Sequence, residues 1–126
     1  MKNERRQNVR HRVIDDAYAA LGRNYSKVGK VQDISIGGLA FDYTPGDITY
    51  QNADTIDIFI ETTPFGLYNL PCTLVYDSIV KTPKVKNQFL DLLTTRRCGI
   101  KFGKLGKDEV KLLMKFISVH TEKFAK

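Results

Sequence analysis

The sequence predicts one small domain of mostly β-structure, an antiparallel β-barrel of about six strands followed by a C-terminal helix. Its 126 residues suit a single domain, and 42% hydrophobic with 27% charged residues is typical of soluble globular proteins. Short stretches with alternating or continuous apolar residues recur at regular spacing between turns that contain Gly or Pro. A single amphipathic helical pattern follows these stretches near the end of the chain.

The N-terminal segment, residues 1–12, is expected to be a flexible basic arm that precedes one domain over residues 13–126. This arm has a net charge of +4 and no hydrophobic periodicity. Residues 13–80 carry −6 and residues 81–126 carry +8. We interpret the C-terminal charge as a solvated lysine-rich face, and so acidic a middle is not typical of a uniformly basic nucleic-acid-binding protein.

Three strands are expected in the first part of the domain. The first runs from Val13 to Leu21 and ends at a turn over residues 22–26. The second, from Val28 to Ile34, leads into a sharp reversal at Gly37-Gly38, where the glycines would supply positive φ angles. The third covers residues 39–43.

Three further strands are expected before the helix. Residues 56–61 alternate with a period of two, which predicts a half-buried strand. A turn at residues 64–66 precedes a strand from Leu70 to Val75, with residues 79–80 as an optional extension. Residues 98–102 form the last strand. No pattern assigns a structure to residues 44–54 or 78–95.

The helix is predicted over about residues 107–124. Asp108 and Glu109 lie in its first turn, where the helix dipole favours carboxylates, and Gly106 is the expected N-cap. Apolar residues at three-to-four-residue spacing form one stripe, which should face the core: Val110, Leu113, Met114, Ile117 and Phe124. We expect this helix to cover one opening of the barrel.

The cellular location expected from the sequence depends on the segments that it lacks and on its two cysteines. The N-terminus has no apolar secretory segment, and no stretch is long enough to span a membrane, so the expected location is the cytoplasm. Cys72 and Cys98 lie in apolar strands and are expected to be buried thiols rather than a disulfide.

No catalytic or metal site is expected. His11 and His120 have no neighbouring ligands at metal-binding spacing. The acidic pair Asp15-Asp16 is interpreted as a solvated strand edge rather than a catalytic dyad, since no positioned partner is visible. Patterns of nucleophile and base, or of a phosphate-binding Walker loop, are missing, so the chain is not expected to be an enzyme.

Two short motifs carry the functional signal, and the first lies in the basic arm. Arg6 and Arg10 have an R-x-x-x-R spacing, with Arg5 beside them. Arginine is a planar, permanently charged fork that suits phosphate and the O6/N7 edge of guanine. Arg96-Arg97 precedes the last strand and is interpreted as surface charge, with a positive field near a ligand as the alternative.

The second motif, from Asp33 to Gly38, reads D-x-S-x-x-G. Asp33 can accept hydrogen bonds from the Watson–Crick edge of guanine, and the Ser35 hydroxyl can donate or accept a hydrogen bond. Gly38 allows a close backbone approach. Taken with the arginines, this motif predicts an anionic ligand that has a purine edge.

Together the motifs resemble the PilZ family, bacterial domains that bind the second messenger cyclic di-GMP. Residues 98–102 are similar to the family's late strand, G-[VI]-[RK]-F, and the terminal helix is where the family has its closing helix. The resemblance implies that arginines grip the phosphates and guanine faces while the second motif holds guanine from the barrel side. The ligand-binding residues implied in this way are Arg5, Arg6, Arg10, Asp33, Ser35 and Gly38.

The resemblance further implies a free-standing receptor that changes conformation on binding and signals to an effector protein, in motility, adhesion or biofilm regulation. A ligand-dependent dimer is also open. Two alternatives remain. A barrel that binds RNA or single-stranded DNA would want aromatics interleaved with lysines on exposed strands, whereas the strand region here is acidic. A PilZ-like interaction module that does not bind nucleotide would usually lack one of the two motifs, and both are intact.

Overall fold

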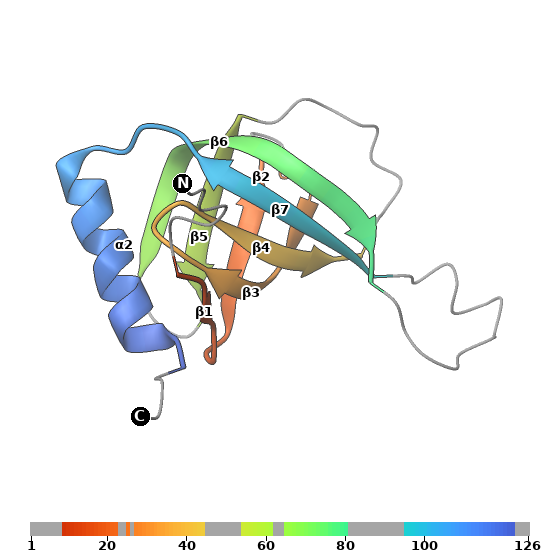
Figure 1. The fold of residues 1–126 in the computed structure, drawn as a ribbon, viewed down its shortest axis with the longest axis horizontal. Helices are drawn as coiled ribbons and strands as arrows, with labels where there is room; N and C mark the ends of the chain where they lie inside the picture. The colour runs from red at the N-terminus through yellow and green to blue at the C-terminus, as the bar shows by residue number, and fades with distance from the viewer. Residues whose placement is uncertain are drawn as a thin grey trace, which may run out of the picture.

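The computed structural model describes residues 9–22, 25, 27–44, 54–61, 65–80 and 95–122. These ranges contain short and long strands and one helix (Figure 1). The strands are β1 (His11–Arg12), β2 (Ala17–Leu21), β3 (Lys27–Ile34), β4 (Gly38–Tyr43), β5 (Thr55–Ile60), β6 (Gly66–Ile79) and β7 (Arg96–Phe102), and the helix is α2 (Lys107–His120).

Strands β2 to β7 form a closed antiparallel barrel. Around the barrel the order is β3-β2-β5-β6-β7-β4, and β4 pairs back with β3 to close the ring. The short strand β1 extends the sheet beside β3. The predicted mostly-β barrel with a C-terminal helix is therefore confirmed.

The first predicted strand is interrupted, which corrects the sequence interpretation. Between β1 and β2 the chain leaves the sheet and turns to the end of α2. Val13 forms a bridge with Thr121, and the Ile14 amide donates to the His120 carbonyl oxygen at 3.0 Å. The last carbonyl groups of a helix have no partner within it, and residues 13–14 meet this need. The contacts of residues 13–14 with the end of α2 therefore replace the strand that the local sequence pattern predicts.

Two residues that the sequence assigned to the basic arm belong to the sheet. His11 pairs with Ile34, and Arg12 pairs with Asp33, in the antiparallel β1–β3 ladder. The arm therefore joins the sheet next to the end of β3, where the D-x-S-x-x-G motif begins. The expected flexibility of residues 1–8 lies outside the described residues.

Strand β6 is longer than predicted, and its first half departs from regular geometry. Asn69 has a φ of 59°, and its amide donates to the Asp57 carboxylate at 2.8 Å. The β5–β6 register shifts between Ile56 and Ile58, around this buried carboxylate. Such irregularity breaks a period of two, so the strand from Gly66 onward was not visible as one element in the sequence.

The core fills the barrel and continues beneath α2. On β4, Leu39, Phe41 and Tyr43 belong to the buried core cluster, whereas on the opposite face of the strand Ala40 is buried and Asp42 is half-buried. Leu113 and Phe116 of α2 belong to the same buried cluster, and the Phe116 ring lies 5.4 Å from that of Phe65. The helix thus packs at one end of the barrel (Figure 1).

Details of the helix differ from the prediction. Its start is confirmed, because the Gly106 amide donates to the Glu109 carboxylate at 2.8 Å. Met114, however, is 55% exposed, since a step of about 100° per residue turns it away from the buried Leu113. The helix ends at His120 rather than near residue 124, because the chain becomes extended at Thr121 and pairs there. Phe124 lies outside the described residues.

Both cysteines are free and buried, as predicted. Burial in the core raises the pKa of Cys72 to about 11 and that of Cys98 to about 12. The uncharged thiols therefore suit the apolar interior, and ionising either one within the folded protein is unfavourable.

These thiols should make the fold sensitive to alkaline pH. The unfolded chain loses its thiol protons above a pKa of 9.0, whereas the folded chain retains them to about 11 or 12. The stabilisation is fully present below pH 9 and declines as pH rises, by about 1.4 kcal/mol per pH unit for each thiol. Urea unfolding of the protein and of Cys98→Ala, from about pH 8 to about pH 10.5, measures this. An equal pH slope in the two proteins would contradict the prediction.

Candidate ligand-binding site

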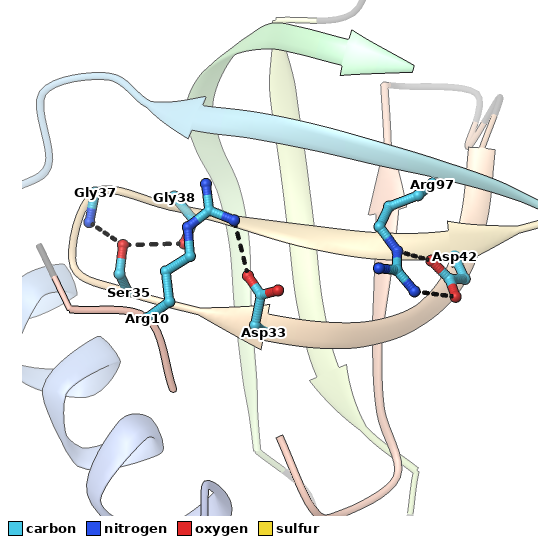
Figure 2. A network of polar contacts seen from close by, with 7 residues as sticks. All are labelled: Arg10, Asp33, Ser35, Gly37, Gly38, Asp42 and Arg97. Atoms are coloured by element: carbon cyan, nitrogen blue, oxygen red, sulfur yellow. Dashed lines mark hydrogen bonds and ion pairs between the residues drawn. The ribbon is translucent and has the colours of Figure 1, made fainter. Parts of the chain in front are cut away.

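The D-x-S-x-x-G motif forms the end of β3, a tight turn and the start of β4 (Figure 2). Ser35 holds the turn from both sides. Its amide donates to the Gly38 carbonyl oxygen at 2.8 Å, and its hydroxyl oxygen accepts from the Gly37 amide at 3.0 Å. With only 6% of its surface exposed, Ser35 shapes the turn in this structure.

Gly38 is needed for close packing within the barrel and not for an unusual φ angle. Among the described glycines only Gly22 has a positive φ, so the expectation for Gly37-Gly38 was wrong. A Cβ atom at Gly38 would lie 2.2 Å from the carbonyl oxygen of Ile100 on β7. The close backbone approach that Gly38 permits is therefore made by the protein's own strand.

The two motifs meet at an ion pair. Arg10 Nη1 lies 3.4 Å from Asp33 Oδ1, and the side chains are 46% and 29% exposed (Figure 2). A pair this long and exposed contributes about 0–1 kcal/mol to stability, so it can open at little cost. Arg5 and Arg6 lie outside the described residues, and the other four predicted ligand residues lie in this one region.

Strand register extends this region across the outer wall of the barrel. Asp33 pairs with Ala40 of β4, Ala40 with Gly99 of β7, and Gly99 with Tyr76 of β6. A Cβ at Gly99 would lie 2.2 Å from the ring of Tyr76, so that ring covers the glycine. Small residues thus separate the Asp33 carboxylate from an aromatic ring. Sequence reasoning missed Tyr76, because only the pairing register brings it here.

Arg96 and Arg97, interpreted from the sequence as surface charge, join neighbouring strands. Arg97 donates two hydrogen bonds to Asp42 of β4, at 2.6 and 3.0 Å (Figure 2). The hydrogen bond to Asp42 is the main cause that raises the Arg97 pKa, and the charge of Asp33 adds to it. Arg96 binds Asp77 of β6 at 2.8 Å. Both arginines are part-buried and paired, so their first role is to connect β7 to its neighbours.

The acidic pair after the arm has separate partners. His120 Nδ1 lies 2.6 Å from Asp15 Oδ2, and Lys30 Nζ lies 3.5 Å from Asp16 Oδ1. Asp15 therefore connects the β1–β2 junction to the end of α2. In the described part of the chain, no group of three or more His, Cys, Asp or Glu side chains could hold a metal ion. Within the same ranges, no helix is long and apolar enough to cross a membrane.

Comparison with known families and structures gives a consistent match. The family model described as PilZ domain matches residues 4–118. The fold is similar to the PilZ domain of Escherichia coli YcgR with c-di-GMP, at 17% identity and a TM-score of 0.65, covering 91% of this chain and 90% of that one. Comparison with curated proteins gives no match.

Two further structures share the fold over part of their length. One is the K. pneumonia MrkH–c-di-GMP complex, at 14% identity and a TM-score of 0.65, with 92% of this chain and 52% of that chain covered. The other is the Bacillus subtilis Inhibitor of motility, MotI/DgrA, at 17% identity and a TM-score of 0.53, with 92% and 50% covered. The chain therefore spans about half the length of these two proteins.

Substituting Gly38 should destabilise the fold whether or not a ligand is present. The Cβ of Gly38→Ala would overlap the backbone of Ile100, which is not the end of a flexible side chain, so the β4–β7 pairing must shift. We expect a loss of roughly 2 kcal/mol or more in unfolding free energy. The control is Gly106→Ala, whose Cβ meets only the Glu109 carboxylate, at 3.7 Å. Equal urea midpoints for Gly38→Ala and the unsubstituted protein would show that the close approach is unimportant.

Proposed function

Because the chain belongs to the PilZ domain family, we propose that it is a receptor for cyclic di-GMP that binds the ligand on the outer wall of the barrel. One observation carries the proposal: Arg10 and Asp33, from motifs separated by 23 positions, meet on an exposed surface. A cation and a carboxylate side by side are what a ligand with both phosphates and guanine edges requires.

Each residue of the site has a separate role in binding the ligand, set by its side-chain chemistry. Arg10 binds a phosphate, and Asp33 accepts hydrogen bonds from the N1–H and N2–H groups of one guanine. The Arg10–Asp33 pair opens to allow this, at a cost of about 0–1 kcal/mol, which charge-assisted hydrogen bonds of about 1.5–3 kcal/mol exceed. Ser35 and Gly38 hold the turn that presents Asp33. Arg5 and Arg6 add phosphate and guanine contacts from the basic arm.

Ordering of the basic arm is the proposed response to the ligand. The arm carries +4 and has no apolar periodicity, so its sequence favours no fixed conformation before phosphates are present. Fixing each residue costs about 1–2 kcal/mol, and contacts to two phosphates oppose that cost. The ordered arm would join the barrel wall in a composite surface for an effector protein, or for a second copy of the chain. Since these contacts are ionic, affinity should fall as salt rises.

This function is binding and signalling, not catalysis, and we place it in the cytoplasm, where two buried free thiols are stable. The charges on the outer wall of the barrel disfavour the alternative that the protein binds nucleic acid. The wall arginines, Arg10 and Arg97, are each matched by a carboxylate, Asp33 and Asp42, which would repel a phosphate backbone. An interaction module without a ligand would have no need of both motifs.

Binding should be selective for cyclic di-GMP over cyclic di-AMP. Adenine lacks the N1–H and N2–H donors of guanine from which Asp33 would accept hydrogen bonds, and it lacks the O6 acceptor. Calorimetric titration of the full chain with each dinucleotide measures the difference, with GTP and a single-stranded oligonucleotide as further controls. Comparable affinity for the two cyclic dinucleotides would overturn the assignment of Asp33.

Removing the Arg10 side chain should weaken binding without harming the fold. Arg10→Ala is expected to lower affinity by about 1.5–3 kcal/mol, the value of a hydrogen bond to a charged group. Its exposed pair with Asp33 contributes about 0–1 kcal/mol, so the thermal midpoint without ligand should fall by no more than about 4 °C. Lys111→Ala, on the exposed side of α2, serves as the charge control. A midpoint lower by about 8 °C or more for Arg10→Ala would mean that Arg10 is structural.

A further inference from the structure

The late strand contains a cation whose position on the barrel wall is well defined. Along β7, Cys98, Ile100 and Phe102 are buried, whereas Lys101 between the last two is exposed. Alternation therefore directs Lys101 outward. Lys101 pairs with Gly38 on one side and with Thr73 of β6 on the other. The lysine thus stands on the strand beside the turn that follows Asp33.

Unlike the neighbouring cations on this wall, Lys101 is not paired with a carboxylate of the described residues. Arg10 forms an ion pair with Asp33, and Arg97 donates hydrogen bonds to both carboxylate oxygens of Asp42. Lys101, by contrast, forms no ion pair with any residue that the structure describes. Its cross-strand neighbours Gly38 and Thr73 carry no charge. On this wall Lys101 can therefore bind an anion without first breaking an ion pair with a carboxylate.

Access to the turn is open from the β7 side. Residues paired directly across antiparallel strands have Cα atoms about 4.5–5.5 Å apart, which the four-carbon stem of lysine can span. Gly38 has no side chain to stand between the Lys101 ammonium and the turn. Arg10 approaches the same turn from the β3 side (Figure 2). An anionic group above the turn would then meet a cation from each side.

We propose that Lys101 binds a phosphate of the cyclic dinucleotide and forms the β7 side of the binding site. This inference rests on the proposed function and adds a residue that neither motif contains. Because Lys101 stands on a strand of the closed barrel, its charge is in place before the basic arm orders. It should therefore also speed the encounter with the ligand, since a fixed cation raises the association rate of an anion.

The test is a titration of the full chain with cyclic di-GMP at about 50 and about 250 mM salt. Lys101→Gln keeps a polar, exposed side chain and removes the charge, and it should weaken binding about tenfold. It should also reduce the dependence of affinity on salt. Lys101→Arg should retain most of the affinity. Lys104→Gln, an exposed lysine just beyond the strand, is the matched control and should change affinity less than twofold.

The outcomes separate the two proposals. Equal affinity of Lys101→Gln and the unsubstituted protein would overturn the role of Lys101 while leaving the receptor assignment intact. Equal losses in Lys101→Gln and Lys104→Gln would also overturn it, because a general charge effect would explain both. No binding to the unsubstituted protein would overturn the receptor assignment and this inference together. Urea midpoints of the variants confirm that the fold is retained.

Discussion

The pairing of β4 with β7 is the interaction on which both the barrel and the candidate site depend. Six consecutive pairs join these strands without a register shift, from Gly38 with Lys101 to Tyr43 with Arg96. The β3–β4, β5–β6 and β6–β7 ladders all contain a shift. This regular pairing is part of the closed ring, and it brings the late strand beside the turn of the second motif.

Each face of this pairing has a distinct consequence. Toward the core, Phe41 and Cys98 are fully buried, so closure completes the hydrophobic interior. Toward solvent, the two-fold hydrogen bond between Arg97 and Asp42 fixes the strands, and Lys101 stands beside the turn. The barrel groups of the proposed site, Asp33, Ser35 and Gly38, are therefore held in place before any ligand binds, which reduces the entropy that binding must overcome.

Local patterns allowed much of the fold to be predicted. The alternation in residues 56–61, the late strand and the start of α2 depend on near neighbours in the sequence. The break between β1 and β2 could not be foreseen, because the end of a helix far along the chain causes it. Met114 was misplaced for a simpler reason: a stripe drawn at three-to-four spacing includes positions at its edge that the barrel does not cover.

The candidate site was predicted in its chemistry but not in its extent. Asp33 and Arg10 could be named because each belongs to a motif. Tyr76 and Lys101 could not be placed, since their positions follow from strand register, which pairs residues far apart in sequence. Gly38 was named for a close backbone approach, and the structure shows such an approach to the strand that contains Ile100, whereas the positive φ expected at this turn is absent, because a glycine needed for close packing looks the same in a sequence as one needed for an unusual φ angle.

Amide chemical shifts would show where on the barrel the ligand binds. A nitrogen-15-labelled sample of the full chain would be titrated with cyclic di-GMP. We expect the largest shifts at residues 33–38, at Arg10 and at residues 97–101, which lie on one wall of the barrel. Shifts confined to β5 and the first half of β6, with residues 33–38 unchanged at saturation, would contradict this expectation.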